Sequence, residues 1–354
     1  MNARIFSAFA ALVAVLLVAG CGKFDLIPAE AGKVAQIEGT HGVRSWSLSR
    51  EQENRILALN PERVTDYDVR NVLAGAPAPR IINIHGGIAT VRERLVSFSK
   101  FLSGLGYPEK ATRNPGNGDY TISCYEDAEM FAGIIAWYYE HEGMQPMMIG
   151  HSQGAMQAVK VLQLLAGQTA RQLTVWSPLN WKPEERTEIT DPLTGRKRPV
   201  VGLGVSYIAA LGGGGATRVL PNQWDMMFSL RSVPDTVEEF TGFYLGLDVL
   251  GGDYLGFGPA NHFRSLGRAK VRNVQLPTNY SHGRTPQLER LLSNPRAIEW
   301  INHYVPSPNP ADPEDIGDVK GIIFGADVWK SVKRHWVIEL QRLIRARRAQ
   351  GHGR

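Results

Sequence analysis

The sequence predicts an α/β fold in which a mostly parallel sheet carries helices on both faces. Short apolar runs typical of buried strands alternate with segments of helical apolar spacing, in the order strand, helix, helix, strand, helix, strand. Parallel neighbours need a crossover between them, and a helix is the usual crossover. The composition is that of a folded globular chain, since 43% of the 354 residues are hydrophobic and 21% are charged.

The first half of the chain alternates strand and helix patterns. An isoleucine-rich run over residues 80–84 predicts a buried strand, and helical spacing over 91–102 predicts the helix that follows it. A second helix is expected over 127–141 and a second buried strand over 146–149. The helix after that strand is expected over 153–165, where a glycine soon follows it.

The second half is less regular. Residues 173–176 predict a third strand, and further strands are expected over 242–248 and 269–276 before a helix over 286–304. Residues 178–240 break this rhythm with turn-rich and glycine-rich stretches that are too long for a plain connection, so we expect an inserted cap or lid there. Its apolar residues would line an acyl pocket or simply pack in a core: Tyr207, Trp224, Met226, Met227 and Phe228.

The N-terminus has the features of an export signal. Arg4 precedes an apolar run over residues 5–19, which is short for a membrane span and typical of a signal peptide. Val18-Ala19-Gly20-Cys21 resembles the lipobox of bacterial lipoproteins, which implies a signal over residues 1–21 and a lipid on Cys21. The resemblance implies anchoring in the bacterial cell envelope, at the outer membrane or on the periplasmic side. The alternatives are an ordinary signal peptide and a buried N-terminal helix.

Three segments complete the expected organisation. Residues 22–50 read as a polar tether, residues 51–305 as the main domain, and residues 306–354 as a C-terminal extension with a basic amphipathic helix. That helix would pack with a solvated basic face, or it would also touch anionic lipid headgroups. No basic groove with interleaved aromatic residues accompanies the net charge of +5, so we expect no nucleic-acid partner. Cys124 is expected to be buried and not nucleophilic.

The motif Gly150-His151-Ser152-Gln153-Gly154 suggests a nucleophile. Ser152 follows the strand predicted over 146–149 and opens the next helix, which is the strand–turn–helix setting of a nucleophile elbow. Glycines on both sides relieve crowding at such a strained turn. A helix-capping serine with glycine neighbours would give the same local pattern, so the catalytic interpretation needs partners elsewhere in the chain.

Two further motifs supply an oxyanion hole and a base. His85-Gly86-Gly87 follows the first strand, where the first oxyanion loop of such a sheet belongs. We expect the backbone N–H groups of Gly87 and Gln153 to form the hole, although a glycine pair after a strand also fits a simple turn. His282 follows the strand over 269–276 and precedes a helix, as the base should. The other late histidines have less suitable positions: His262, His303 and His335.

The acid has several candidates. Asp248 ends the apolar run over 242–248 and lies between Ser152 and His282 in sequence, which makes it our first choice. Asp235 is the main rival, but Asp235-x-x-Glu238 also matches a helix-capping box. Two more aspartates stay open as alternatives: Asp225 and Asp253.

Together these motifs resemble the lipase and esterase branch of the α/β-hydrolase family, over roughly residues 55–305. The resemblance implies an α/β-hydrolase fold and a membrane-anchored serine hydrolase. Such an enzyme cleaves a small-molecule or lipid ester through an acyl-enzyme on Ser152, with no metal and no cofactor. An acyltransferase that uses the same acyl-enzyme is one alternative, and a non-catalytic envelope lipoprotein with this fold is another.

Overall fold

The computed structural model describes residues 48–87, 89–169, 172–213, 218, 223–224, 226, 228–246, 248, 251 and 261–351. All of these residues belong to one compact unit, which comprises residues 39–354. The predicted signal peptide with Cys21, and nearly all of the predicted tether, lie outside the described residues. Among the described helices, none combines the length and the apolar character needed to cross a membrane.

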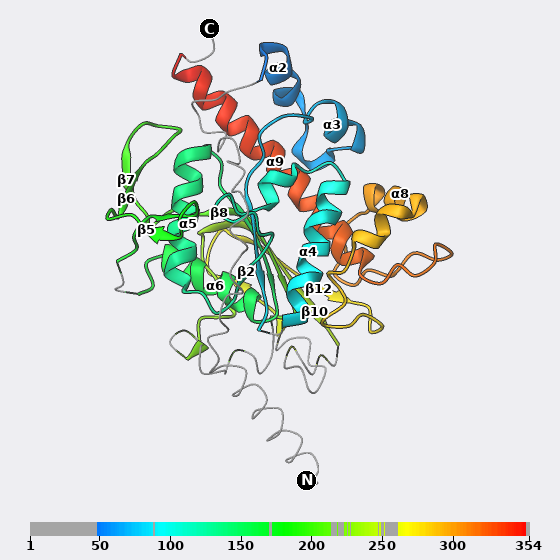
Figure 1. The fold of residues 1–354 in the computed structure, drawn as a ribbon. Helices are drawn as coiled ribbons and strands as arrows, with labels where there is room; N and C mark the ends of the chain where they lie inside the picture. The colour runs from blue at the N-terminus through cyan, green and yellow to red at the C-terminus, as the bar shows by residue number, and fades with distance from the viewer. Residues whose placement is uncertain are drawn as a thin grey trace. The chain divides into compact units, whose positions relative to one another are not determined.

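A six-stranded, all-parallel sheet forms the centre of this unit (Figure 1). In chain order its strands are β1 (Ile81–His85), β2 (Ile122–Ser123), β3 (Met147–His151), β8 (Val205–Leu211), β10 (Val237–Leu245) and β12 (Lys270–Leu276). Across the sheet the order is β12-β10-β8-β3-β1-β2. The chain moves one way from β1 to β2 and the other way from β3 onward. Ligands of doubly wound sheets bind beyond the carboxyl ends of the strands at such a reversal.

Helices cover both faces of the sheet. Successive side chains of a strand point to opposite faces, so Tyr207 packs in one apolar core and its neighbour Ile208 packs in the other. The core that contains Tyr207 is covered by α4 (Ala89–Gly104) and α9 (Ile322–Ala349), and the core that contains Ile208 by α5 (Ala128–Glu142) and α6 (Gln153–Leu165). This arrangement confirms the predicted α/β class with a parallel sheet between two layers of helices.

The predicted insertion over residues 178–240 is only partly right. Residues 205–211 form β8, a central strand with every side chain buried. The run is as apolar as a buried strand should be, but the glycine-rich stretches around it made the whole segment resemble an excursion from the sheet. The strand predicted over 173–176 lies instead outside the central sheet. There β4 (Trp176–Ser177) pairs antiparallel with β5 (Lys182–Pro183).

The helix predicted over residues 286–304 is divided in two. A 3₁₀ helix, η5 (Glu289–Ser293), is followed by α8 (Pro295–His303), with Asn294 between them. The Asn294 side chain accepts hydrogen bonds from the first amides of α8, and proline at the first helical position cannot continue the preceding helix.

The remaining elements are short and lie around the sheet. They are α2 (Arg50–Ala58), η1 (Pro61–Arg63), α3 (Asp66–Asn71), η2 (Glu109–Thr112), the antiparallel pair β6 (Glu188–Thr190) and β7 (Lys197–Pro199), and the parallel pair β9 (Ser232–Val233) and β11 (Arg264–Ser265).

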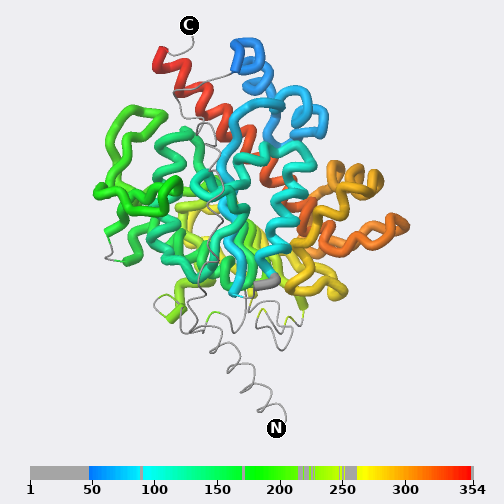
Figure 2. The backbone as a smooth tube through the Cα atoms, in the orientation of Figure 1, coloured from blue at the N-terminus to red at the C-terminus, as the bar shows by residue number. Residues whose placement is uncertain are grey.

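The C-terminal helix α9 packs in the core that contains Tyr207. It is therefore part of the main unit and not the extension that the sequence predicts. Its apolar stripe is buried, as Trp329 and Trp336 illustrate, but Lys333 and His335 on other faces are buried as well. Figure 2 shows α9, in red, beside the segment that contains α2 and η1, in blue.

The cationic face of α9 is largely occupied by acidic partners. Arg334 Nε lies 2.6 Å from Glu62 Oε1, and Arg348 Nη2 lies 2.8 Å from Glu53 Oε2. These two arginines therefore connect α9 to α2 and η1, and they do not form the solvated basic face that the sequence suggested.

Candidate active site

Ser152 lies on the turn between β3 and α6, at the carboxyl edge of the sheet. Its φ of 56° and ψ of −123° are strained for a residue with a side chain. A capping serine has an extended backbone, and its side chain accepts a hydrogen bond from the first turn of its helix. Within the described residues, the Ser152 side chain makes no such bond to α6. The geometry therefore favours the sharp elbow over the capping interpretation.

Close packing around this turn explains two of the nearby glycines. A side chain at Gly154 would collide with the carbonyl oxygen of Ile84 in β1. A Cβ at Gly86 would lie 2.7 Å from the Cβ of Ser152 and 3.3 Å from its Oγ. The start of α6 and the loop after β1 therefore approach each other so closely that only glycine fits at these positions.

Gly87 and Gln153, the predicted oxyanion-hole residues, lie on the two segments next to Ser152. A Cβ at Gly87 would be 3.1 Å from the side-chain Oε1 of Gln153, so the two residues are neighbours. Gln153 is the first residue of α6, and the amides of a first helical turn have no acceptor within the helix. They also carry the positive end of the helix dipole. The site therefore presents N–H groups of the kind that stabilise an oxyanion.

The structure brings His282 and Asp248 together. His282 Nδ1 lies 2.7 Å from Asp248 Oδ2, and both side chains are buried, with 4% and 6% of their surface exposed. Asp248 follows β10 and His282 follows β12, so both belong to the same edge of the sheet as Ser152. The second carboxylate oxygen, Asp248 Oδ1, accepts a hydrogen bond from the amide of Gly251 at 2.9 Å.

Gly212, at the end of β8, makes room for this pair. Its φ is 62°, and a Cβ there would lie 2.8 Å from the His282 ring and 3.4 Å from Asp248 Oδ2. Sequence reasoning missed this role because the glycine-rich stretch after Leu211 read as a flexible loop. The usable signal was a glycine directly after a buried apolar run.

His151 joins the His282 segment to the nucleophile strand. Its Nε2 lies 2.8 Å from the backbone oxygen of His282, and the centroids of the two rings are 4.7 Å apart. Burial lowers the pKa of His151 well below its ordinary value, and the charges of His282 and Arg94 lower it further. His151 is therefore neutral and donates through Nε2. This contact ties the segment that carries His282 to the last residue of β3, directly before Ser152 in the chain, and sequence reasoning did not single it out.

Of the rival acids, only Asp235 lies among the described residues, and it is far from Asp248 along the strand. Asp235 precedes β10 at the opposite edge of the sheet, where it accepts hydrogen bonds from the amides of Arg268 and Ala269. No helix begins there, so the capping-box interpretation was wrong. Asp225 and Asp253 lie outside the described residues.

Two of the three rival histidines lie in helices and have other surroundings. His303 is an exposed residue at the end of α8, and His335 is fully buried with its Nε2 3.2 Å from Glu239 Oε2. The ring of His262 is tilted by 60° against the ring of Tyr244, and their centroids are 5.0 Å apart.

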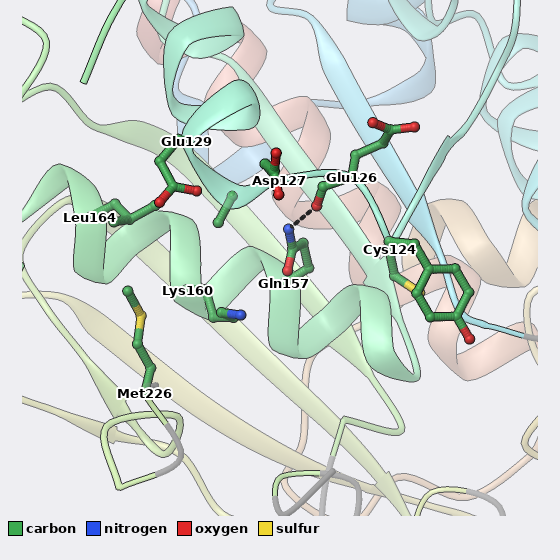
Figure 3. A pocket seen from close by; sticks show the side chains of 10 residues that line it. Cys124, Glu126, Asp127, Glu129, Gln157, Lys160, Leu164 and Met226 are labelled. Atoms are coloured by element: carbon green, nitrogen blue, oxygen red, sulfur yellow. Dashed lines mark hydrogen bonds between the residues drawn. The ribbon is translucent and has the colours of Figure 1, made fainter. Parts of the chain in front are cut away.

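A cavity of about 200 Å³ lies beside the first turn of α5 and the part of α6 that carries Gln157, Lys160 and Leu164 (Figure 3). Its wall includes Cys124, Tyr125, Gln157, Lys160 and Met226. Cys124 is buried and its Sγ lies 3.5 Å from Gln153 Oε1, while the Tyr125 hydroxyl lies next to Gly87. Burial raises the pKa of the Cys124 thiol to about 12, so this residue is not a thiolate nucleophile. Through Cys124 and Tyr125, the wall of the cavity thus contacts the two predicted oxyanion-hole residues.

The residues expected to line an acyl pocket or to pack in a core have different surroundings. Tyr207 packs in the core of the sheet, whereas Trp224 and Phe228 are 63% and 87% exposed. Met226 does line the cavity beside α6. Met227 lies outside the described residues.

Compared with known proteins, the chain matches no family model, no curated protein and no solved structure. In the part of the chain that the structure describes, no three His, Cys, Asp or Glu side chains are grouped so as to hold a metal ion. The geometry around Ser152 is thus the basis for the function proposed next.

Proposed function

We propose that the protein is a serine hydrolase of the α/β-hydrolase type that cleaves carboxylic esters, with Ser152, His282 and Asp248 as its catalytic triad. The observation that carries the proposal is the buried hydrogen bond between His282 Nδ1 and Asp248 Oδ2, at the sheet edge where Ser152 forms its strained elbow. The triad partners follow the chain order Ser, Asp, His, which is the order of α/β-hydrolases.

The proposed reaction begins with His282 as the base. Its Nε2 takes the hydroxyl proton of Ser152 while Oγ forms a bond to the carbonyl carbon of the ester. The carbonyl oxygen becomes an oxyanion that accepts hydrogen bonds from the amides of Gly87 and Gln153. Asp248 holds His282 in the tautomer with its proton on Nδ1 and stabilises the imidazolium.

The intermediate then collapses to an acyl-enzyme. The bond between the carbonyl carbon and the alcohol oxygen breaks, and His282 gives its proton to the departing alkoxide. Water, deprotonated by His282, attacks the acyl carbon, and Ser152 leaves with the proton returned by His282. The carboxylic acid is the second product.

The cysteine at position 21 extends the proposal to the cell envelope. A lipid on Cys21 would anchor the enzyme to a membrane, because anchoring strength grows with each buried methylene group. The full-length protein should then fractionate with membranes, and Cys21→Ser should move it to the soluble fraction. If the parent protein is soluble from the start, the anchored part of the proposal fails.

Hydrolysis of p-nitrophenyl acetate, butyrate and a long-chain ester tests the proposal. We expect turnover that Ser152→Ala abolishes, with Ser123→Ala as a control. Ser123 lies at the same edge of the sheet, where its hydroxyl accepts a local hydrogen bond from the amide of Tyr125. An added alcohol that captures the acyl group in preference to water would instead identify an acyltransferase. Equal turnover by Ser152→Ala and the parent would contradict the assignment.

A further inference from the structure

Arg94 is a half-buried cation beside the proposed site. It belongs to the second turn of α4, the helix that follows the loop of Gly86 and Gly87. A side chain at Gly283, the residue after His282, would collide with Arg94 Nη1. The guanidinium group therefore lies against the backbone of the loop that carries His282, in the space that a side chain at position 283 would take.

Arg94 forms no ion pair with any carboxylate of the described residues. Among the described residues, no carboxylate or carbonyl oxygen lies within hydrogen-bonding distance of its guanidinium, whereas Arg92, two residues earlier, pairs with Glu93 and Asp119. The carboxylate of Asp248 is already occupied by His282 and the amide of Gly251. A partly desolvated cation with unused donors is costly unless something binds it.

The nearby histidines do not compete for an anion as cations. Burial lowers the pKa of His85 to about 4, and burial also lowers the pKa of His151. Both rings are neutral at pH 7, so neither adds a positive charge beside Arg94. Its planar guanidinium presents paired N–H donors that match the oxygens of a carboxylate or a phosphate.

The side of the site that Arg94 occupies indicates which half of an ester it would meet. In acyl transfer to serine, the histidine gives its proton to the leaving alcohol, so the alcohol half lies on the histidine side. Arg94 contacts the residue directly after His282. We infer that Arg94 binds an anionic group, a carboxylate or a phosphate, on the alcohol half of the ester. This inference rests on the proposed function and assigns a substrate class to it.

Matched acetate esters test the inference. The probes are 4-acetoxybenzoate and 4-acetoxyphenyl phosphate, with 4-acetoxybenzamide as the neutral partner, so the acyl group is the same throughout. The parent enzyme should have a higher kcat/KM for at least one anionic ester than for the neutral one. Arg94→Gln should lower kcat/KM for that anionic ester about tenfold to a hundredfold, because hydrogen bonds to charged groups are lost. The same variant should change the neutral ester less than about threefold.

Two variants serve as controls. Arg94→Lys keeps the charge and loses the paired donors, so we expect an intermediate loss for the anionic ester. Arg92→Gln removes a charge of the same helix that is already paired, and it should leave the ratio between the anionic and the neutral ester unchanged. A ratio that is the same in Arg94→Gln and the parent overturns the inference and leaves the esterase proposal intact. If the parent protein hydrolyses none of the esters and its Ser152 does not react, both the esterase proposal and the inference about Arg94 are overturned.

Discussion

His282 Nδ1 lies 2.7 Å from Asp248 Oδ2, although 34 residues separate them in the chain. The sheet produces this contact, because the two residues follow the neighbouring parallel strands β10 and β12, whose carboxyl ends lie side by side. Parallel pairing thus brings two residues from distant loops together as a buried pair, and Gly212, directly after β8, leaves the space for it.

Asp248→Asn should lower kcat about 10⁴-fold, because an amide cannot hold the imidazole in the required tautomer or stabilise its charged form. Turnover of p-nitrophenyl acetate measures the effect. Asp235→Asn, at the opposite edge of the sheet, is the matched control and should keep parental turnover. The opposite pattern, with the loss at Asp235, would refute the choice of acid.

His151→Phe should weaken both stability and turnover. The variant leaves the buried carbonyl oxygen of His282 without its donor, which costs about 1–3 kcal/mol of unfolding free energy in urea. Displacement of the His282 loop should lower kcat roughly tenfold to a hundredfold. His303→Phe, on an exposed helix end, should change neither quantity. Parental kcat in His151→Phe would show that this contact does not position His282.

Gly154→Ala should destabilise the fold, because the added methyl group meets the backbone carbonyl of Ile84 and neither α6 nor β1 can yield easily. We expect a loss of about 1–3 kcal/mol in urea unfolding, as for other overpacked sites. At Gly246 the nearest atoms would be 3.9 Å from an added Cβ, so Gly246→Ala should stay within about 0.5 kcal/mol of the parent. Equal stability of the two variants would be inconsistent with the close approach of α6 and β1.

Glu339 on α9 should make stability depend on pH. Burial raises its pKa from 4.5 to about 7, while Arg342 and the amide of Gln145 oppose the shift. The folded chain therefore holds this proton more tightly than the unfolded chain, so the contribution is full below pH 4.5 and is lost as pH rises towards 7. Glu339→Gln should remove this pH dependence of the free energy of unfolding, which is worth up to about 3 kcal/mol.

Urea unfolding at pH 5 and pH 8 measures this difference. The parent should lose more stability than Glu339→Gln between the two values. Glu314→Gln, an exposed residue, should behave as the parent does. Parallel pH profiles for the parent and Glu339→Gln would contradict the assignment.

Apart from the two-residue edge strand β2, the first half of the fold could be predicted, because local patterns and final structure agree there. Residues 146–149 are an uninterrupted apolar run and became β3, and α6 covers the predicted residues 153–165. Each strand is followed by a helix whose apolar side faces the sheet, so periodicity alone carried the information.

The central position of β8 and the packing of α9 were not predicted, because both depend on contacts that are distant in sequence. The apolar run of β8 is short and stands in a glycine-rich setting, and only its pairing with β3 and β10 identifies it as a central strand. The charges of α9 suggested a solvated helix, yet Arg334 and Arg348 meet Glu62 and Glu53 nearly three hundred residues away in sequence. Long-range pairing of this kind leaves no local periodic signal.

The candidate site also has a part that could be predicted from the sequence and a part that could not. The strand–turn–helix context of Ser152 and the glycines after β1 could be read from the sequence, because both depend on neighbouring residues. The contacts of His151 with His282, and of Arg94 with Gly283, join different loops and became visible only in the folded chain.

The most direct test of the central claim is whether Ser152 is an activated nucleophile. We expect a fluorophosphonate to add one phosphonyl group per chain, and mass spectrometry of the proteolysed protein to find it on the peptide that contains Ser152. Ser152→Ala should take up none, and Asp248→Asn should react far more slowly than the parent. Absence of labelling in the folded parent protein, or equal labelling of Ser152→Ala, would contradict the account.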